Sequence, residues 1–139
     1  MGTQQQMQQQ KQFTGTAMNT DGNRLPLMLA SLPDTIYKFL LELLLNIKYE
    51  KFISWTGNDW EFKINDPVRV SQLWMKRQKK TKMNYDILSR NIRYYYGKGI
   101  IERTHNKEYV YYFVLDLRTM LNITPSQLWK KYKLTPKPV

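Results

Sequence analysis

The stretch that decides the fold is MNYDILSRNIRYYYGKGII, residues 83–101. It predicts an α-helix over residues 84–96, which Gly97 and Gly99 would end. At about 100° per residue, one face of this helix is apolar or aromatic, and we expect that face to contact the core. Its residues are Tyr85, Leu88, Ile92, Tyr95 and Tyr96.

The opposite face of the predicted helix carries Arg90 and Arg93, one turn apart, together with Asp86, Ile87 and Tyr94. An α-helix fits the major groove of B-DNA, where a planar guanidinium can bind the O6 and N7 atoms of guanine. Two arginines one turn apart can therefore read two adjacent guanines. The alternative is an arginine pair on a solvated helix face, with Asp86 as its partner.

The composition favours a polyanionic partner. The chain has 139 residues, 42% of them hydrophobic, which suffices for one domain with a core. It carries 22 Lys and Arg against 11 Asp and Glu, a net charge of +11. Nine basic and two acidic residues lie between 76 and 103, interleaved with tyrosines. Nucleic acid is the first candidate partner and an anionic membrane surface the second.

Working outward, local signals predict further helices and two hairpins. Apolar spacing from Ile36 to Ile47 predicts a helix capped by Asp34, and Asp66-Pro67 starts a helix that the basic run 76–82 ends. Other segments are β-branched and aromatic around polar turns, or carry capping residues. These predict hairpins from 52–55 with 60–64 and from 100–103 with 109–113, a short helix over 116–121, and a last helix that Thr124 caps.

Several aromatic and apolar residues have two interpretations. Trp55, Trp60 and Phe62 of the first hairpin are expected in the core rather than on a base-stacking platform. Leu121, Leu128 and Trp129 either pack on the domain or present a surface to a protein partner.

Other classes of function are disfavoured. The chain has no cysteine and one histidine, His105, expected in a loop, so we predict no metal and no cofactor. No apolar run approaches the roughly 18 residues of a membrane span. We also predict no enzyme, because the carboxylates form no convergent pair and no catalytic motif is present. Those carboxylates are Glu42, Asp59, Glu61, Asp66 and Asp86.

The stretch at 83–101, with ISWTGNDWEFKINDP at 53–67 and YVYYF at 109–113, resembles the ETS DNA-binding domain. The resemblance runs from about Ile36 to Phe113 and weakly on to about Trp129. It implies an α+β winged helix-turn-helix, with three helices on a small four-stranded antiparallel sheet and two short appended helices. It also implies sequence-specific binding to double-stranded DNA with a GGA core, by a transcription regulator in the nucleus.

By motif position, the resemblance assigns a role to eleven residues. Arg90 and Arg93 match the two guanine-reading arginines, and Tyr94 an aromatic that touches bases or backbone beside them. The phosphate contacts include a backbone N–H at the start of the first helix, that of Ile36. The others are Trp74, Lys80, Lys82, Tyr85, Lys98, Arg103 and Tyr109.

Six positions depart from the family pattern. Ile87 stands where a phosphate-contacting lysine is common, and Asn91 where Ala or Gly is usual; both can tune the preference for bases flanking the core. Gln78 replaces a common basic residue, Thr81 a common proline and Met75 a common glycine before the recognition helix; these changes can alter affinity and the geometry of that turn. Tyr37 replaces a usual tryptophan of the first helix, where we expect only repacking.

The predicted organisation is a Gln-rich, disordered tail over residues 1–33, the domain over 34–114, appended helices over 115–133 and a tail over 134–139. Pro26 and Pro33 argue against a helix between them, although residues 25–32 can also be a docking peptide. The alternative functions are a non-specific binder of RNA or single strands, which would show weak sequence preference, and a protein-interaction module.

Overall fold

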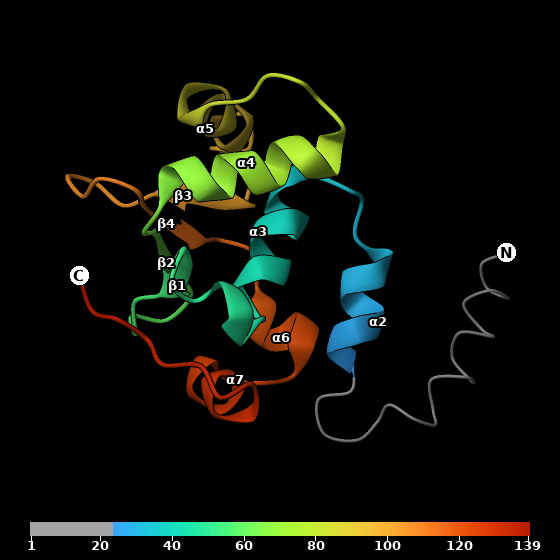
Figure 1. The fold of residues 1–139 in the computed structure, drawn as a ribbon. Coiled ribbons are helices and arrows are strands. Elements are labelled where there is room, and N and C mark those ends of the chain that lie inside the picture. The colour runs from blue at the N-terminus through green and yellow to red at the C-terminus, as the bar shows by residue number, and fades with distance from the viewer. Residues whose placement is uncertain (1–23) are drawn as a thin grey trace, which may run out of the picture.

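The computed structural model describes residues 24–139, so the expectation of a Gln-rich tail over residues 1–23 lies outside the described residues. Helices pack around one small antiparallel sheet, which confirms the predicted α+β class (Figure 1). The elements in chain order are α2 (Arg24–Ser31), α3 (Ile36–Leu44), the 3₁₀ turn η1 (Ile47–Tyr49), β1 (Ile53–Trp55), β2 (Glu61–Ile64), α4 (Pro67–Gln78), α5 (Tyr85–Arg93), β3 (Ile101–Arg103), β4 (Val110–Phe113), α6 (Leu117–Leu121) and α7 (Pro125–Lys131).

The sheet has the order β1-β2-β4-β3, and all neighbouring strands are antiparallel. Both predicted hairpins are present, and each strand begins one residue later than predicted. Because side chains alternate along a strand, one face of the sheet is apolar and meets the helices. Trp55, Phe62 and Tyr111 form one row across this face, and all three are buried. Trp60 is buried as well, so the hairpin aromatics belong to the core as expected.

Local capping chemistry sets where four helices begin. The side chains of Asp66, Asn84 and Asp116 accept a backbone hydrogen bond at the start of α4, α5 and α6, and Thr124 forms a capping box with Gln127 at the start of α7. Each of these residues is a short polar side chain that competes well for first-turn N–H groups. The starts of α4 and α7 are therefore those that the sequence predicts.

The cap of α3 differs from the prediction. Thr35, not Asp34, caps this helix, with its Oγ1 accepting from the backbone N of Lys38. Asp34 is instead bonded to Arg77 of α4, with 2.9 Å between Oδ1 and Nη2. An ion pair with a distant segment of the chain has replaced the local cap.

Two helices end earlier than predicted. Helix α3 ends at Leu44, and Ile47 lies 55% exposed in η1, where Asn46 accepts from the N of Lys48 and starts a new, tighter turn. Helix α5 ends at Arg93 instead of Tyr96. The backbone N–H groups of Tyr95 and Tyr96 bond to the carbonyl three residues back, which tightens the chain before Gly97 turns at a φ of 75°.

The expectation of no helix between Pro26 and Pro33 was wrong, because α2 covers residues Arg24–Ser31. Pro26 lies in the first turn, where a missing backbone N–H removes no helical hydrogen bond, and Pro33 follows the helix end. The helix contacts α6, and Met28 and Leu29 are partly buried against the core. Tertiary packing therefore supports this short helix.

The end of the chain packs on the domain. Leu121 and Leu128 are 1% and 0% exposed, so these two cannot present a surface to a partner as the alternative reading required. In residues 134–137 the backbone N of Lys137 donates to the carbonyl of Trp55 at 2.8 Å, which covers the free edge of β1. Among the described helices, none combines the length and apolarity that crossing a bilayer requires.

Candidate nucleic-acid interface

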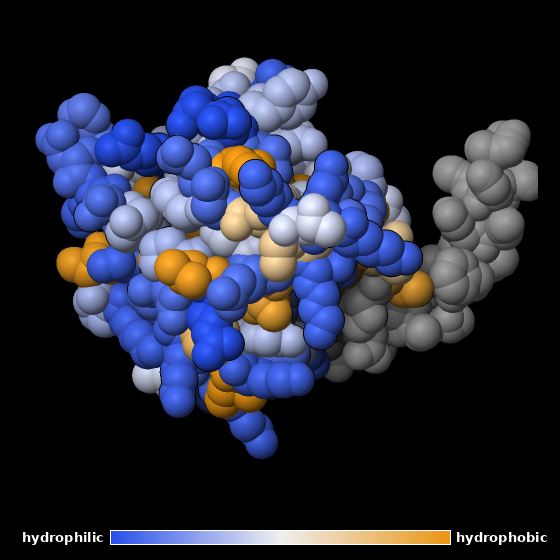
Figure 2. Space-filling model, turned by 45° about the horizontal axis from the view of Figure 1, so that its top comes forward, coloured by the Kyte–Doolittle hydropathy of each residue, from blue (hydrophilic) through white to orange (hydrophobic). Residues whose placement is uncertain are grey.

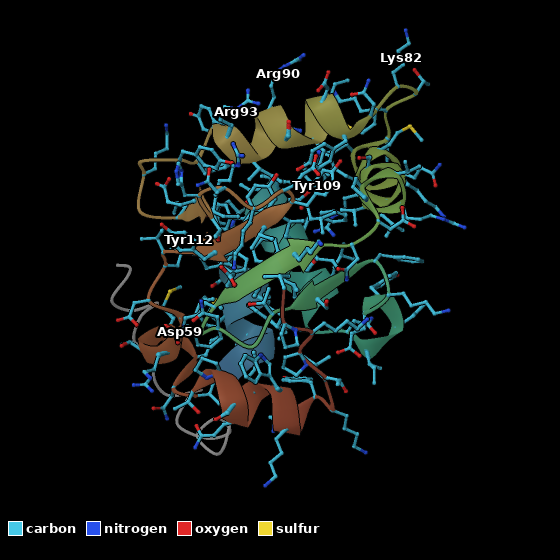
Figure 3. All side chains as sticks on the ribbon, turned by 90° about the vertical axis from the view of Figure 1, so that its left-hand side faces the viewer. Asp59, Lys82, Arg90, Arg93, Tyr109 and Tyr112 are labelled. Atoms are coloured by element: carbon cyan, nitrogen blue, oxygen red, sulfur yellow. The ribbon has the colours of Figure 1, made fainter. Side chains whose placement is uncertain are left out.

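The outer face of α5 presents two unpaired arginines. Arg90 and Arg93 are exposed, and neither forms an ion pair or hydrogen bond with any residue of the described range 24–139. Asp86 does not pair with them, which removes the alternative in which the arginines serve that carboxylate. Tyr94, at 65% exposed, extends the same face. Figure 3 shows Arg90 on the outer side of α5, at the same end of the molecule as Lys82.

The inner face of α5 fixes this helix to the domain. Leu88 and Ile92 are both 0% exposed, and the aromatic residues predicted for this face pack against the core. Tyr95 meets Tyr37 of α3 edge to face, with ring centroids 5.1 Å apart. Tyr37 is 8% exposed and belongs to the core, and the orientation of the two arginines is set by buried contacts.

A first hollow of about 630 Å³ lies between α5, the C-terminal end of α4 and the start of α3. It gathers several residues that the resemblance assigns to DNA, although they are far apart in sequence. Those predicted to contact bases or phosphates are Ile36, Trp74, Lys80, Lys82, Arg90 and Tyr94, with Ile87 and Asn91 on the same wall.

Two groups in the first hollow are donors without a partner. The indole Nε1 of Trp74 is buried and has no hydrogen-bond partner among the described residues. Leaving a buried donor unsatisfied is costly, so such a group is suited to an incoming acceptor. The backbone N–H of Ile36 lies in the first turn of α3, where N–H groups have no intrahelical partner and the helix dipole favours an anion.

The loop between α4 and α5 carries Lys80 and Lys82 beside this hollow. Helix α4 ends with Lys79 in the left-handed conformation, at a φ of 55°, and Lys80 N donates back to the carbonyl of Met75 at 3.0 Å. This closure satisfies the last carbonyls of the helix without the usual glycine. One turn earlier, Arg77 bonds Glu42 at 2.8 Å and Asp34 at 2.9 Å, which ties α4 to α3.

A second hollow of about 300 Å³ lies on the other side of α5, against the β3–β4 hairpin. It brings together Arg93, Arg103, Tyr85 and Tyr109, of which the last three are predicted phosphate contacts. The Tyr85 and Tyr109 rings meet edge to face at 5.1 Å. The predicted phosphate-contacting residues thus divide between two hollows that flank α5.

One predicted contact lies outside both hollows. Lys98 is exposed in the turn after α5, and its Nζ lies 4.4 Å from the centroid of the Tyr94 ring. This cation–π contact holds a positive charge beside the exposed tyrosine. Figure 2 brings the side of the molecule that carries α4 and α5 forward, and hydrophilic side chains cover much of it, with small apolar areas between them.

The sequence reasoning missed Tyr111, which also lines the second hollow. The available signal was alternation in the predicted strand 109–113, in which residues two apart share a side. In the structure Tyr109 precedes β4 in a left-handed conformation, with a φ of 67°, and both tyrosines still line the hollow. The sequence reasoning also gave Ile87 an exposed place on the helix, whereas Ile87 is half-buried in the first hollow. His105 lies in the β3–β4 turn, as expected.

Burial raises the pKa of the tyrosines beside the second hollow. The pKa of Tyr96 rises to about 12, mainly by burial, and the pKa values of Tyr85 and Tyr111 are also raised above the usual value, chiefly by burial. All three hydroxyls are therefore protonated at neutral pH.

These shifts predict a loss of stability in alkaline solution. Above about pH 10 the tyrosines of the unfolded chain release protons that the folded chain retains, so unfolding becomes easier as the pH rises. We expect the free energy of unfolding, measured with urea, to lose this contribution between about pH 10 and pH 12, and Tyr96→Phe to lessen the slope. An identical slope in wild type and Tyr96→Phe would contradict the assignment.

Comparison with known proteins gives a consistent result. A family model described as Ets-domain matches residues 33–114. Protein C-ets-1 of Mus musculus and that of Homo sapiens are each 50% identical over 104 residues, which is 75% of this chain and 24% of the relative. Protein C-ets-2 of Lytechinus variegatus is 48% identical over 105 residues, 76% of this chain and 96% of the relative. The chain thus spans about a quarter of the length of the C-ets-1 relatives.

Proposed function

The chain belongs to the Ets-domain family, and we propose that it is the sequence-specific DNA-binding part of a transcription factor. It binds duplexes with a GGA core through α5 in the major groove. Arg90 and Arg93 read the two guanines, and the hollows on either side of α5 receive backbone phosphates. A protein with this function acts in the nucleus.

The observation that carries the proposal is a pair of exposed guanidinium groups one turn apart on α5, both unpaired within residues 24–139. A guanidinium that has no partner within its own domain can offer two parallel donors to guanine O6 and N7. The buried faces of Leu88 and Ile92 hold the helix still, so the two donors are presented at a fixed spacing. This preorganisation favours readout of two adjacent base pairs over general attraction to a polyanion.

The two hollows support a role in fixing the register on DNA. Phosphate contacts position a protein on a duplex, whereas base contacts specify the sequence. A helix in the major groove lies between two phosphate backbones, and the basic and hydroxyl groups here lie on both sides of α5. The unpartnered Nε1 of Trp74 and the first-turn N–H of Ile36 supply further donors on one side.

The bases that flank the GGA core would lie beside the first hollow. Ile87 and Asn91 line it beside Arg90, one turn before it and one residue after it along α5. An apolar side chain can contact a thymine methyl, and an asparagine can bond adenine, so these two residues tune the preference outside the GGA core. Ile87 also removes the positive charge of the usual lysine, which leaves one fewer phosphate contact.

The test is an anisotropy titration at about physiological salt with two duplexes, one carrying a GGAA core and the other GAGA in its place. We expect a preference of roughly 10³-fold for GGAA, the range that separates specific from non-specific sites. Logarithmic affinity should fall against logarithmic salt concentration with a slope of roughly −5 to −7, for about six to eight neutralised phosphates. Equal affinity for both duplexes would overturn the proposed sequence readout.

A further inference from the structure

The buried hydroxyl of Tyr111 is a polar group that the function proposed above does not use. Tyr111 lies on the helix-facing side of β4, is 3% exposed, and stacks on Phe62 of β2 with centroids 5.7 Å apart. Its hydroxyl is hydrogen-bonded to the hydroxyl of Tyr85, the first residue of α5. One hydrogen bond therefore joins the sheet to the start of the proposed recognition helix.

The number of protons in this pair leaves one of them free. Each tyrosine hydroxyl has a single proton to donate, and the bond between the two hydroxyls uses only one of the two protons. Both hydroxyls remain protonated at neutral pH, because burial raises the pKa of each. The second proton is available to an acceptor from outside the pair.

The surroundings decide which tyrosine meets that acceptor. Both tyrosines line the second hollow, but Tyr111 is only 3% exposed, whereas Tyr85 is half-buried and is the more accessible of the two. The hollow is lined by the guanidinium groups of Arg93 and Arg103 and by one carboxylate, that of Glu108, so its charge remains positive and favours an anion. An anion that enters the hollow from solvent therefore reaches the more exposed Tyr85 first, which leaves the Tyr111 proton to the Tyr85 oxygen.

We propose that Tyr111 is a positioning residue for DNA binding, whose hydroxyl donates to the Tyr85 hydroxyl and directs the Tyr85 proton to a backbone phosphate. The inference rests on the proposed function, since the phosphate belongs to a duplex bound by α5. Donation from Tyr111 polarises the Tyr85 hydroxyl and makes it a stronger donor. The perpendicular ring of Tyr109 limits the movement of Tyr85.

A double-mutant cycle tests the coupling. Wild type, Tyr85→Phe, Tyr111→Phe and the double variant are titrated with the GGAA duplex. We expect Tyr85→Phe to weaken binding about 10-fold and Tyr111→Phe about 3- to 10-fold, as for a hydrogen bond to a charged group. The double variant should bind no more weakly than Tyr85→Phe, because both changes remove one chain of donors. Losses that multiply in the double variant would overturn the proposal.

A second series identifies the phosphate. Duplexes are made in which one phosphate at a time is replaced by a neutral methylphosphonate, and each is titrated with the same proteins. At one position wild type should lose affinity while Tyr85→Phe loses no more, and on that duplex Tyr111→Phe should bind as well as wild type. A structural role of Tyr111 would instead give the same loss on every duplex, and that result would also overturn the proposal.

Tyr112→Phe is the matched control, because Tyr112 is the next residue of β4 and lies on the opposite face of the sheet (Figure 3). Its affinity should equal that of wild type. Should thermal unfolding show that Tyr111→Phe is less stable, its titrations are made well below its unfolding midpoint, and an equal loss of affinity on every duplex would still overturn the proposal. If wild type showed no preference for GGAA, the proposed sequence readout would be overturned. The role of Tyr111 would still be tested, because the double-mutant cycle can be measured on any duplex that the protein binds.

Discussion

Replacing Arg90 or Arg93 with alanine is expected to weaken binding to a GGAA duplex by about 5- to 150-fold, equivalent to roughly 1 to 3 kcal/mol. Each change removes the two donors offered to one guanine, so discrimination at that base pair should fall as well. Neither arginine supports the fold, because both are exposed and unpaired within the described residues. The thermal stability of the variants should therefore match that of wild type.

Lys80→Ala separates base reading from charge. Lys80 is exposed beside the first hollow, and a lysine that contacts a phosphate contributes equally on any sequence. We expect Lys80→Ala to weaken GGAA and GAGA duplexes alike and to reduce the salt slope by about 1. Equal losses on both duplexes for the arginine variants would show that Arg90 and Arg93 act only as charges.

Phe62→Ala should destabilise the domain by roughly 3 to 5 kcal/mol, the cost typical of removing a buried aromatic ring. Phe62 is 0% exposed in the middle of the sheet and contacts the rings of Trp55, Tyr111 and Phe113. A small domain is stable by only about 5 to 15 kcal/mol, so this loss is a large share of the whole. Urea unfolding measures it as a lower midpoint with an unchanged slope.

Val68→Ala is the control for that experiment. Val68 is also apolar, but it is 64% exposed on α4, so its truncation creates no cavity in the core. Its effect should stay within about 0.5 kcal/mol. A comparable loss in Phe62→Ala and Val68→Ala would contradict the description of the core. Bound GGAA duplex should raise the midpoint of both variants, because DNA binds the folded state.

Secondary structure followed the sequence where the deciding contacts are local. Asp66-Pro67 and Thr124-Pro125 combine a capping side chain with a proline that needs no backbone partner, and α4 and α7 begin there. The prediction failed where a distant segment decides. Asp34 is bound to Arg77 of another helix and leaves the cap of α3 to Thr35. Helix α2 forms against α6, although Pro26 and Pro33 argued against a helix.

The candidate site, like the secondary structure, was predictable only where local contacts decide it. Helical periodicity alone placed Arg90 and Arg93 on the outer face of α5, because 3.6 residues per turn fixes which residues share a side. The resemblance supplied the phosphate-contacting residues but not their grouping. Burial leaves the Trp74 indole without a hydrogen-bond partner in the described part of the chain. The bond between Tyr85 and Tyr111 joins residues that lie 26 positions apart.

The sequence by itself determined the class of fold, the basic outer face of the recognition helix and the family, because periodicity, capping and motif spacing act over a few residues. Only the tertiary structure decided how the two hollows flank α5, which donors are left without partners, and that Leu121 and Leu128 are buried rather than displayed. These features depend on side chains from strands and helices that meet only after folding. Burial and the pairing of polar groups are properties of that packing, and no local pattern encodes them.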